Sequence, residues 1–323
     1  FTGYRAGSSL TTGSYNVGYG RNTLLNSVNS NYTVAIGDEA IGLGVLTGSK
    51  NVVIGQQAGY DLTSGHSNVL TSYRAGYNLT TGAYNFFSGY QAGLNATTAS
   101  QAIAIGYNAI GLGVLTGTDN IAIGNQAGYD LTSGTYNNFM GYAAGWNATT
   151  ADNNVAIGRQ AIGLGVLTGT NNIALGYQAG YDLTSGTYNN FMGYQAGHNA
   201  TTGSHNILQG FQTGVNATTA SETVAIGKAT IGTGVLTGIR NVAIGSSAGQ
   251  DLTSGHTNVF AGYLAGSNAT TGTYNTAFNQ ALTGVLTGSH NIAVGLYAGE
   301  DLTSGTYNTF LNNYAGANIT TGS

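Results

Sequence analysis

Residues 155–206 read VAIGRQAIGLGVLTGTNN, IALGYQAGYDLTSGTYN and NFMGYQAGHNATTGSHN when the chain is divided after a recurring asparagine. The three rows share an apolar triplet, a glycine, a Q-A segment, a segment close to L-T-T-G and the closing asparagine. Most rows have about 17 residues, and the rows that carry IGLGVLTG are one residue longer. Roughly nineteen such rows fill the chain, with a period in the range of solenoid repeats.

Each row predicts one coil of a solenoid. The apolar triplets are rich in Val and Ile, which favour an extended backbone, and frequent glycine disfavours helix by about 1 kcal/mol per residue relative to alanine. We expect the glycine that ends L-T-T-G to adopt a positive φ and turn the chain. Rows of constant length favour parallel stacking with like residues above one another. The sequence therefore predicts an all-β fold, a parallel β-solenoid or β-roll of roughly nineteen coils of about 17 residues.

The domain organisation follows from the continuity of the repeat. No linker or shift in composition divides residues 1–323, so we expect a single repeat solenoid domain. Phe1 enters in the middle of a row, and Ser323 stops before its closing asparagine. Because an open terminal coil exposes unpaired edges, we expect a fragment of a fibre or an uncapped filament subunit.

The closing asparagine of each row is the most regular polar residue. An asparagine side chain can hydrogen-bond the backbone of the next coil and tolerates the left-handed conformation of turns. Stacked rows therefore predict a structural asparagine ladder. Its members are Asn51, Asn68, Asn85, Asn120, Asn137, Asn154, Asn172, Asn189, Asn206, Asn241, Asn258, Asn275, Asn291 and Asn308.

The apolar triplet has two faces, because alternate residues of a strand point in opposite directions. Its outer positions carry Val or Ile, which we assign to the core of the coil, and its middle position carries Ala or a large residue. A strand that is apolar on both faces is usually buried on both, so we expect the middle face to meet a partner, most simply identical chains. The alternative is that this face packs inside the same chain. The candidate interface residues are Phe87, Phe139, Phe191, Phe260 and Phe310.

The composition excludes several classes of function. Charged residues are 6% of the chain, against about 25% in typical globular proteins. The 7 Lys and Arg residues are scattered, so we expect no nucleic-acid binding. The chain has no Cys, which removes disulfides and thiolate metal sites. The most apolar stretch, residues 102–124, is broken by Gly, Asn and Asp, so we expect no membrane span.

No arrangement of histidines indicates catalysis or metal binding. His66 and His256 occupy the same place in equivalent rows, His205 and His290 directly precede the closing asparagine, and His198 lies in a variable turn. No acidic residue accompanies them at a fixed spacing. We expect solvated turn residues, no cofactor and no enzymatic activity.

The acidic residues also follow the repeat. The repeated aspartate of D-L-T-S-G could indicate a calcium site, but an Asx turn is favoured, because the glycine-rich motif of calcium-binding β-rolls is absent. Glycoside hydrolysis would need paired carboxylates, and the adjacent pairs Asp38–Glu39 and Glu300–Asp301 face opposite ways in a strand. The repeated aspartates are Asp61, Asp130, Asp182, Asp251 and Asp301.

The sequence leaves the role of two surface features undecided. Stacked threonines, as at Thr63, Thr80 and Thr97, form the kind of array that can bind ice. Asn-x-Thr sequons would carry a row of glycans in a glycosylating host, although Asn-x-Thr also makes a good turn. The sequon asparagines are Asn31, Asn78, Asn95, Asn147, Asn199, Asn216, Asn268 and Asn318.

Several rows resemble a known family. NIAIGNQA from Asn120 and NVAIGSSA from Asn241 resemble the head repeats of trimeric autotransporter adhesins, and GTYNNFMGYQAG with NATTG is similar to repeats of bacteriophage tail fibres. The resemblance covers nearly the whole chain and implies a left-handed β-roll, a homotrimer and a role in display or attachment. The rows here, at about 17 residues, are longer than the adhesin-head repeat.

Taken with the residues, the resemblance gives the functional expectation. We expect a structural and adhesive segment of an extracellular, cell-surface or virion fibre, either shaft or head. The expected partners are identical chains, as a trimer or an end-to-end polymer, and host-surface glycans or proteins. The alternatives are a subunit of a self-assembling, glycosylated extracellular filament and an ice-binding solenoid.

Overall fold

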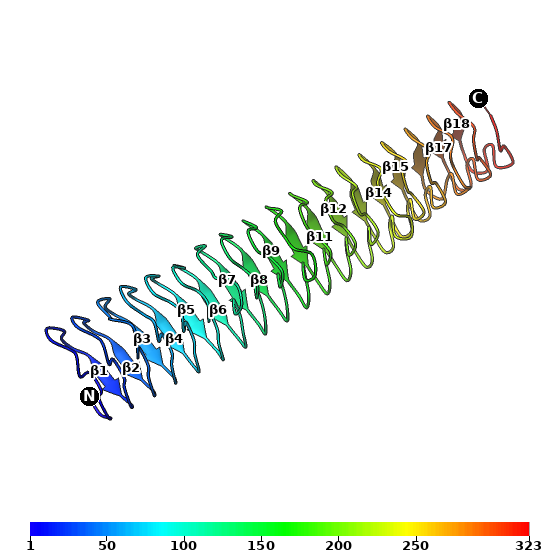
Figure 1. The fold of residues 1–323 in the computed structure, drawn as a ribbon. Coiled ribbons are helices and arrows are strands. Elements are labelled where there is room, and N and C mark those ends of the chain that lie inside the picture. The colour runs from blue at the N-terminus through cyan, green and yellow to red at the C-terminus, as the bar shows by residue number, and fades with distance from the viewer. Residues whose placement is uncertain (323) are drawn as a thin grey trace. The chain divides into compact units, whose positions relative to one another are not determined.

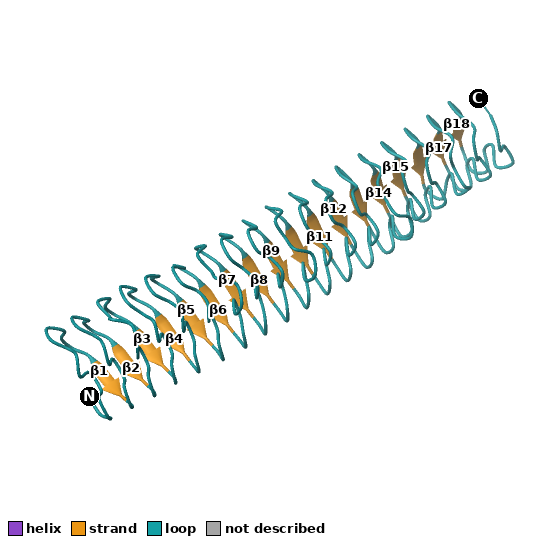
Figure 2. Ribbon diagram, viewed as in Figure 1, coloured by secondary structure: helices purple, strands orange, loops and turns teal. Residues whose placement is uncertain are grey.

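The computed structural model describes residues 1–322, and each coil contributes one three-residue strand joined by turns (Figure 2). The fold is an all-β parallel solenoid, as the sequence predicted, with no helix among residues 1–322. Equivalent residues of successive coils, such as Asn51, Asn68 and Asn85, are separated by 17 positions. Accordingly, the described residues hold no helix of the length and apolarity needed to cross a membrane. They form two compact units, Phe1–Gln160 with Val166–Thr168, and Ala161–Gly165 with the residues from Gly169 onward.

The first unit contains nine strands. They are β1 (Val17–Tyr19), β2 (Val34–Ile36), β3 (Val52–Ile54), β4 (Val69–Thr71), β5 (Phe86–Ser88), β6 (Ile103–Ile105), β7 (Ile121–Ile123), β8 (Asn138–Met140) and β9 (Val155–Ile157).

The second unit contains nine more. They are β10 (Ile173–Leu175), β11 (Asn190–Met192), β12 (Ile207–Gln209), β13 (Val224–Ile226), β14 (Val242–Ile244), β15 (Val259–Ala261), β16 (Thr276–Phe278), β17 (Ile292–Val294) and β18 (Thr309–Leu311).

Within each unit, successive strands pair in parallel and in register (Figure 1). Val34 of β2 pairs with Val52 of β3, and Val224 of β13 pairs with Val242 of β14. Coil-to-coil hydrogen bonds continue outside the strands, as from Asp61 N to Tyr77 O at 3.0 Å. The turns are therefore stacked as regularly as the strands, which satisfies their backbone groups.

The core runs along the inside of the coils. In the coil of β7, it consists of the middle strand residue Ala122, Ala127 of the Q-A-G segment and Leu131, all fully buried. The middle residue of every strand is buried in the same way, and the outer two are exposed or half-buried.

This arrangement corrects the predicted assignment of the two strand faces. The five phenylalanines expected at a partner interface point into their own coil, with exposed fractions from 0% to 7%. The alternative, in which the middle face packs inside the same chain, is what the structure shows. The residues concerned are Phe87, Phe139, Phe191, Phe260 and Phe310.

Glycine makes room for these rings. Six residues after Phe87 stands Gly93, where an added Cβ would lie 2.5 Å from a ring carbon of Phe87. Coils with Ala in the middle of the strand can carry a larger residue at that position, as Ala104 is followed by Ile110. In such coils the two positions are complementary in volume. Where both are small, as with Ala122 and Gly128, the Phe139 ring of the next coil lies 3.2 Å from an added Cβ at Gly128.

The glycine of L-T-T-G has another role than predicted. Gly134 does not have a positive φ; instead, an added Cβ there would lie 2.3 Å from Ala151 O of the next coil. The left-handed conformation falls elsewhere, as at Gln126 with φ 56° and Tyr136 with φ 57°. The prediction of a positive φ was wrong because this glycine serves the close approach of two coils.

Candidate assembly surface

The outward positions of the strands form an exposed surface that is mostly apolar, with polar residues such as Asn138, Asn190 and Gln209 in some coils. We define the outward strand face as the first and third residues of each strand. In the second unit, Ile226 and Ile244 of this face are 37% and 43% exposed. In the first unit, Ile54 and Ile157 are exposed as well. These side chains are held outward because the middle residue of each triplet fills the core.

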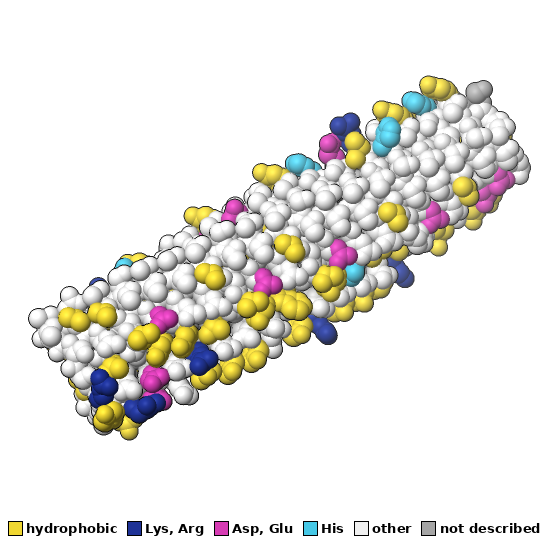
Figure 3. All heavy atoms as spheres, in the orientation of Figure 1, with side chains coloured by type: hydrophobic (Ala, Val, Ile, Leu, Met, Phe, Trp, Pro, Cys, Tyr) yellow, Lys and Arg dark blue, Asp and Glu magenta, His cyan; other side chains and the backbone are white. Residues whose placement is uncertain are grey.

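Charge is absent from the outward strand face. None of its residues in β1–β18 is Asp, Glu, Lys, Arg or His. In-register pairing places its Val and Ile side chains one above another, as with Ile226 and Ile244. In Figure 3, hydrophobic side chains are drawn in yellow, and scattered charged side chains are visible between them in the view shown. A regular apolar face of this kind is typical of a protein–protein contact.

The closing asparagines form a buried column inside the coils. Asn51 Oδ1 accepts hydrogen bonds from Asn68 N at 3.0 Å and Asn68 Nδ2 at 3.2 Å, and Asn51 Nδ2 donates to Gly65 O at 2.9 Å. The pattern recurs in the second unit, where Asn258 N donates to Asn241 Oδ1 at 3.0 Å. The column is interrupted where another residue closes a row, as at Ala102, whose N–H still donates to Asn85 Oδ1.

Most of the sequon asparagines are half-buried in a second polar column. Asn78 Nδ2 donates to Asn95 Oδ1 at 2.7 Å, and Asn199 Nδ2 donates to Asn216 Oδ1 at 2.6 Å. A glycan would be attached at the same nitrogen, so these contacts favour the turn role of Asn-x-Thr. Asn31 and Asn268 likewise donate to backbone carbonyls. Among residues 1–322, no hydrogen bond joins the Asn318 side chain to another residue. Asn147 lies at the equivalent position of its own coil.

The structure gathers no metal site from the repeated acids and histidines. No group of three or more His, Asp or Glu side chains lies together in residues 1–322. Burial raises the pKa of Asp61 and of Asp130 above the ordinary value. Asp251 accepts from the hydroxyl of Thr233 in the preceding coil. His290 stacks between Tyr274 and Tyr307, with ring centroids 4.9 and 4.8 Å away.

The threonine column is engaged with the backbone. Thr63 Oγ1 donates to Thr80 O at 3.0 Å, and Thr80 Oγ1 donates to Thr97 O at 3.0 Å. These hydroxyls stabilise the stacking of the turns. The donor hydrogens of these hydroxyls are therefore used within the chain.

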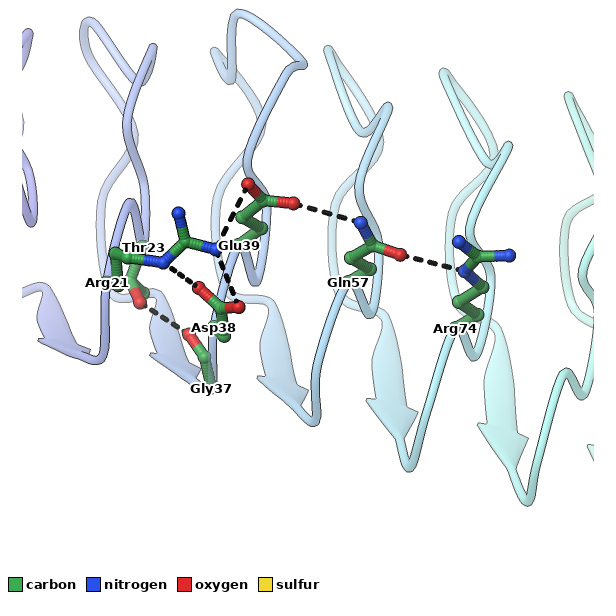
Figure 4. Close-up of polar contacts among 7 residues, drawn as sticks. All are labelled: Arg21, Thr23, Gly37, Asp38, Glu39, Gln57 and Arg74. Carbon is green, nitrogen blue, oxygen red and sulfur yellow. Dashed lines mark hydrogen bonds and ion pairs between the residues drawn. The ribbon is translucent and has the colours of Figure 1, made fainter.

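A charged ladder crosses successive coils of the first unit (Figure 4). Arg21 Nε lies 2.9 Å from Asp38 Oδ1, and Arg21 also contacts Glu39. Gln57 links Glu39 to Arg74, with hydrogen bonds of 2.9 and 2.8 Å. Because the Arg21 side chain is 56% exposed, solvent screens the pair and its contribution to stability is small. We assign the ladder to coil-to-coil stabilisation.

Reasoning from sequence missed the outward strand face because both faces of the triplet are apolar. In part of the coils, the residue six positions after the middle of the strand is a signal that distinguishes them. It is Gly93 after Phe87, Gly145 after Phe139 and Ile110 after Ala104. Such a compensation in volume indicates two residues that share one core.

Neither protein-family models nor curated proteins give a match to the chain.

Proposed function

We propose that the chain is a structural and adhesive segment of an extracellular fibre, located on a cell surface or virion, and that its outward strand face packs against identical chains. The observation that carries this proposal is the uncharged, in-register and mostly apolar face that the strands of each unit present. Burying such a face is favourable by about 25 cal/mol per Å². A rigid stack of coils joined in this way would act by display and attachment.

Identical chains fit this face better than an unrelated partner does. Parallel strands repeat every 4.7–4.9 Å or so, and a second copy repeats its side chains at the same interval. Two copies can therefore interdigitate over many coils in succession, and a closed symmetric assembly would leave no face uncovered. The resemblance to adhesin heads and tail fibres favours a trimer.

The test is the mass of the full chain in solution, measured by light scattering, for the wild type and for Ile226→Lys/Ile244→Lys. Lysine places charge in the middle of the outward strand face, so we expect the wild type to be a stable oligomer and the double variant a single chain. Val235→Lys is the matched control, because Val235 is 56% exposed but lies outside the strands. Circular dichroism checks that each variant keeps its fold.

The outcomes separate the alternatives. A wild-type trimer that the double variant loses supports the proposal. A wild type with the mass of one chain overturns it. Polymers that grow with concentration and persist in the double variant would contradict face-to-face assembly and favour the end-to-end filament.

A further inference from the structure

One coil breaks the repeat. The closing asparagines on either side of β16, Asn275 and Asn291, are separated by 16 positions. The equivalent row of β13, Val224–Asn241, is two positions longer, although both rows contain GVLTG and are of the same kind. The short row is therefore the place in the second unit where the stacked side chains cannot continue without a gap.

The gap lies just after the strand. In the neighbouring coils, two residues precede the buried alanine: Tyr263 and Leu264 before Ala265, and Leu296 and Tyr297 before Ala298. The short coil has only Gln280 there, between Asn279 and Ala281. The column that contains Leu264 and Tyr297 therefore has no member in between.

A notch of about 390 Å³ opens at this position. Leu264 and Tyr297 both line it, together with polar side chains of four successive coils. This volume is within the range of small-molecule sites, about 300–1,000 Å³. The polar side chains on which the following argument rests are Asn268, Gln280, Glu300 and Asp301.

Backbone groups in the notch are also left without their usual partners. In the coil of β6, Leu112 N and Gly113 N donate to Tyr129 O of the next coil at 2.9 and 3.0 Å. The equivalent residues of the short coil are Thr283 and Gly284, which line the notch. Within residues 1–322, neither of them donates a backbone hydrogen bond, and Glu300 O accepts none. Two donors and one acceptor at the notch are therefore left without a backbone partner in the described chain.

The charge of the notch restricts what can bind. Neither Glu300 nor Asp301 forms an ion pair within the described part of the chain. An anionic ligand would be repelled, whereas hydroxyl groups donate strong hydrogen bonds to carboxylates. Asn268 and Gln280 can both donate and accept. The ring of Tyr297 offers an apolar surface beside these groups.

We propose that this notch binds a neutral sugar ring. A pyranose combines hydroxyl groups, which donate and accept hydrogen bonds, with an apolar C–H face that packs on Tyr297. The carboxylates of Glu300 and Asp301 accept from its hydroxyls, and Thr283 N and Gly284 N donate to its oxygens. The site would give the proposed fibre a contact for glycans, so its biological role rests on that function, whereas sugar binding in solution is measured independently of assembly.

The test is saturation-transfer NMR of the full chain with glucose, galactose and N-acetylglucosamine, followed by titration. We expect saturable binding of at least one of them, and no binding of sialic acid, which is anionic. Tyr297→Ala and Asp301→Asn should each weaken the binding about tenfold. The matched controls are Tyr314→Ala, next in the stack with Tyr297 but outside the notch, and Asp251→Asn, the same residue of another D-L-T-S-G segment.

Each outcome decides the proposal. Binding that Tyr297→Ala and Asp301→Asn weaken, and that the two controls keep, supports it. The absence of saturable binding by all three neutral sugars overturns it, as does equal weakening by the site variants and their controls. A saturable shift with calcium chloride alone, without sugar binding, would make the notch a cation site instead. The Ile226→Lys/Ile244→Lys variant separates this proposal from the proposed assembly. It should lose assembly and keep sugar binding.

Discussion

The ring of Phe139 lies against Gly145 of its own coil, so closely that an alanine Cβ at position 145 would come within 2.6 Å of Phe139 Cγ. The same relation joins Phe191 and Gly197, at 2.9 Å from a ring carbon. These pairs fix which face of the strand is the core. The outer Val and Ile side chains are consequently left for the outward strand face.

A substitution in this pair tests the core directly. Gly145→Ala should destabilise the chain by about 2–4 kcal/mol, since it overpacks the core and places a Cβ at positive φ. Phe139→Leu should relieve part of this cost, so the double variant should be more stable than the sum of the two single changes predicts. The measurement is chemical denaturation followed by circular dichroism.

Gly128→Ala is the matched control for that cycle. Gly128 has a similar φ of 57°, but its added Cβ would lie 3.2 Å from the Phe139 ring. Its coupling to Phe139→Leu should therefore be smaller. Equal coupling at Gly128 and Gly145 would contradict the close packing of Phe139 on Gly145.

The asparagine column predicts a second stability effect. Asn68 is fully buried, and its Oδ1 accepts from both Asn85 N and Asn85 Nδ2 at 3.0 Å. Asn68→Ala would leave buried polar groups unpaired, at a cost of about 1–3 kcal/mol. Denaturation should detect this loss, and amide exchange at position 85 should accelerate. Ser64→Ala, an exposed change nearby, should do neither; similar losses in both variants would argue against the column as a source of stability.

The half-buried aspartates predict a dependence on pH. Burial raises the pKa of Asp61 above its ordinary value of 3.8, so the folded state holds the proton at a pH where the unfolded state has lost it. The contribution to stability is therefore greatest below that value and is lost as the pH rises through the raised pKa. Asp61→Asn should remove this slope and raise the melting temperature at pH 7 by about one or two degrees.

Thermal melts of the wild type and Asp61→Asn between acidic and neutral pH check this result. Asn78 and Asn95 occupy the same column in the following coils, so asparagine fits the position sterically. A variant that melts lower than the wild type at pH 7 would show that the charged form is stabilised there instead.

The assembly surface predicts a cross-linking pattern. The chain has no Cys, so a single introduced cysteine reports only on its own surroundings. Ile244→Cys should form disulfides between chains on mild oxidation, because identical chains that meet through the outward strand face bring equivalent residues together. Val235→Cys should not. A non-reducing gel reads the result, and cross-linking at Val235→Cys alone would place the contact on another side of the coil.

The sequence was sufficient to predict the coil, but it did not show which face of the strand points into the core and which points outward. Row length, the position of the strand and the column through Asn51 and Asn68 all follow from like residues stacking on like. The orientation of the strand does not follow, since Val155 and Ala156 are both apolar and only packing against residues six positions away decides which is buried. The notch beside Tyr297 arises because the row of β16 is shorter than equivalent rows. It is therefore found by comparing row lengths, since no sequence motif marks it.

The most direct test of assembly through the outward strand face is the mass of the chain of residues 1–323 in solution over a wide range of concentrations. We predict a constant mass equal to a small whole-number multiple of one chain, with three as the expected multiple. A constant mass of one chain at every concentration would contradict the account.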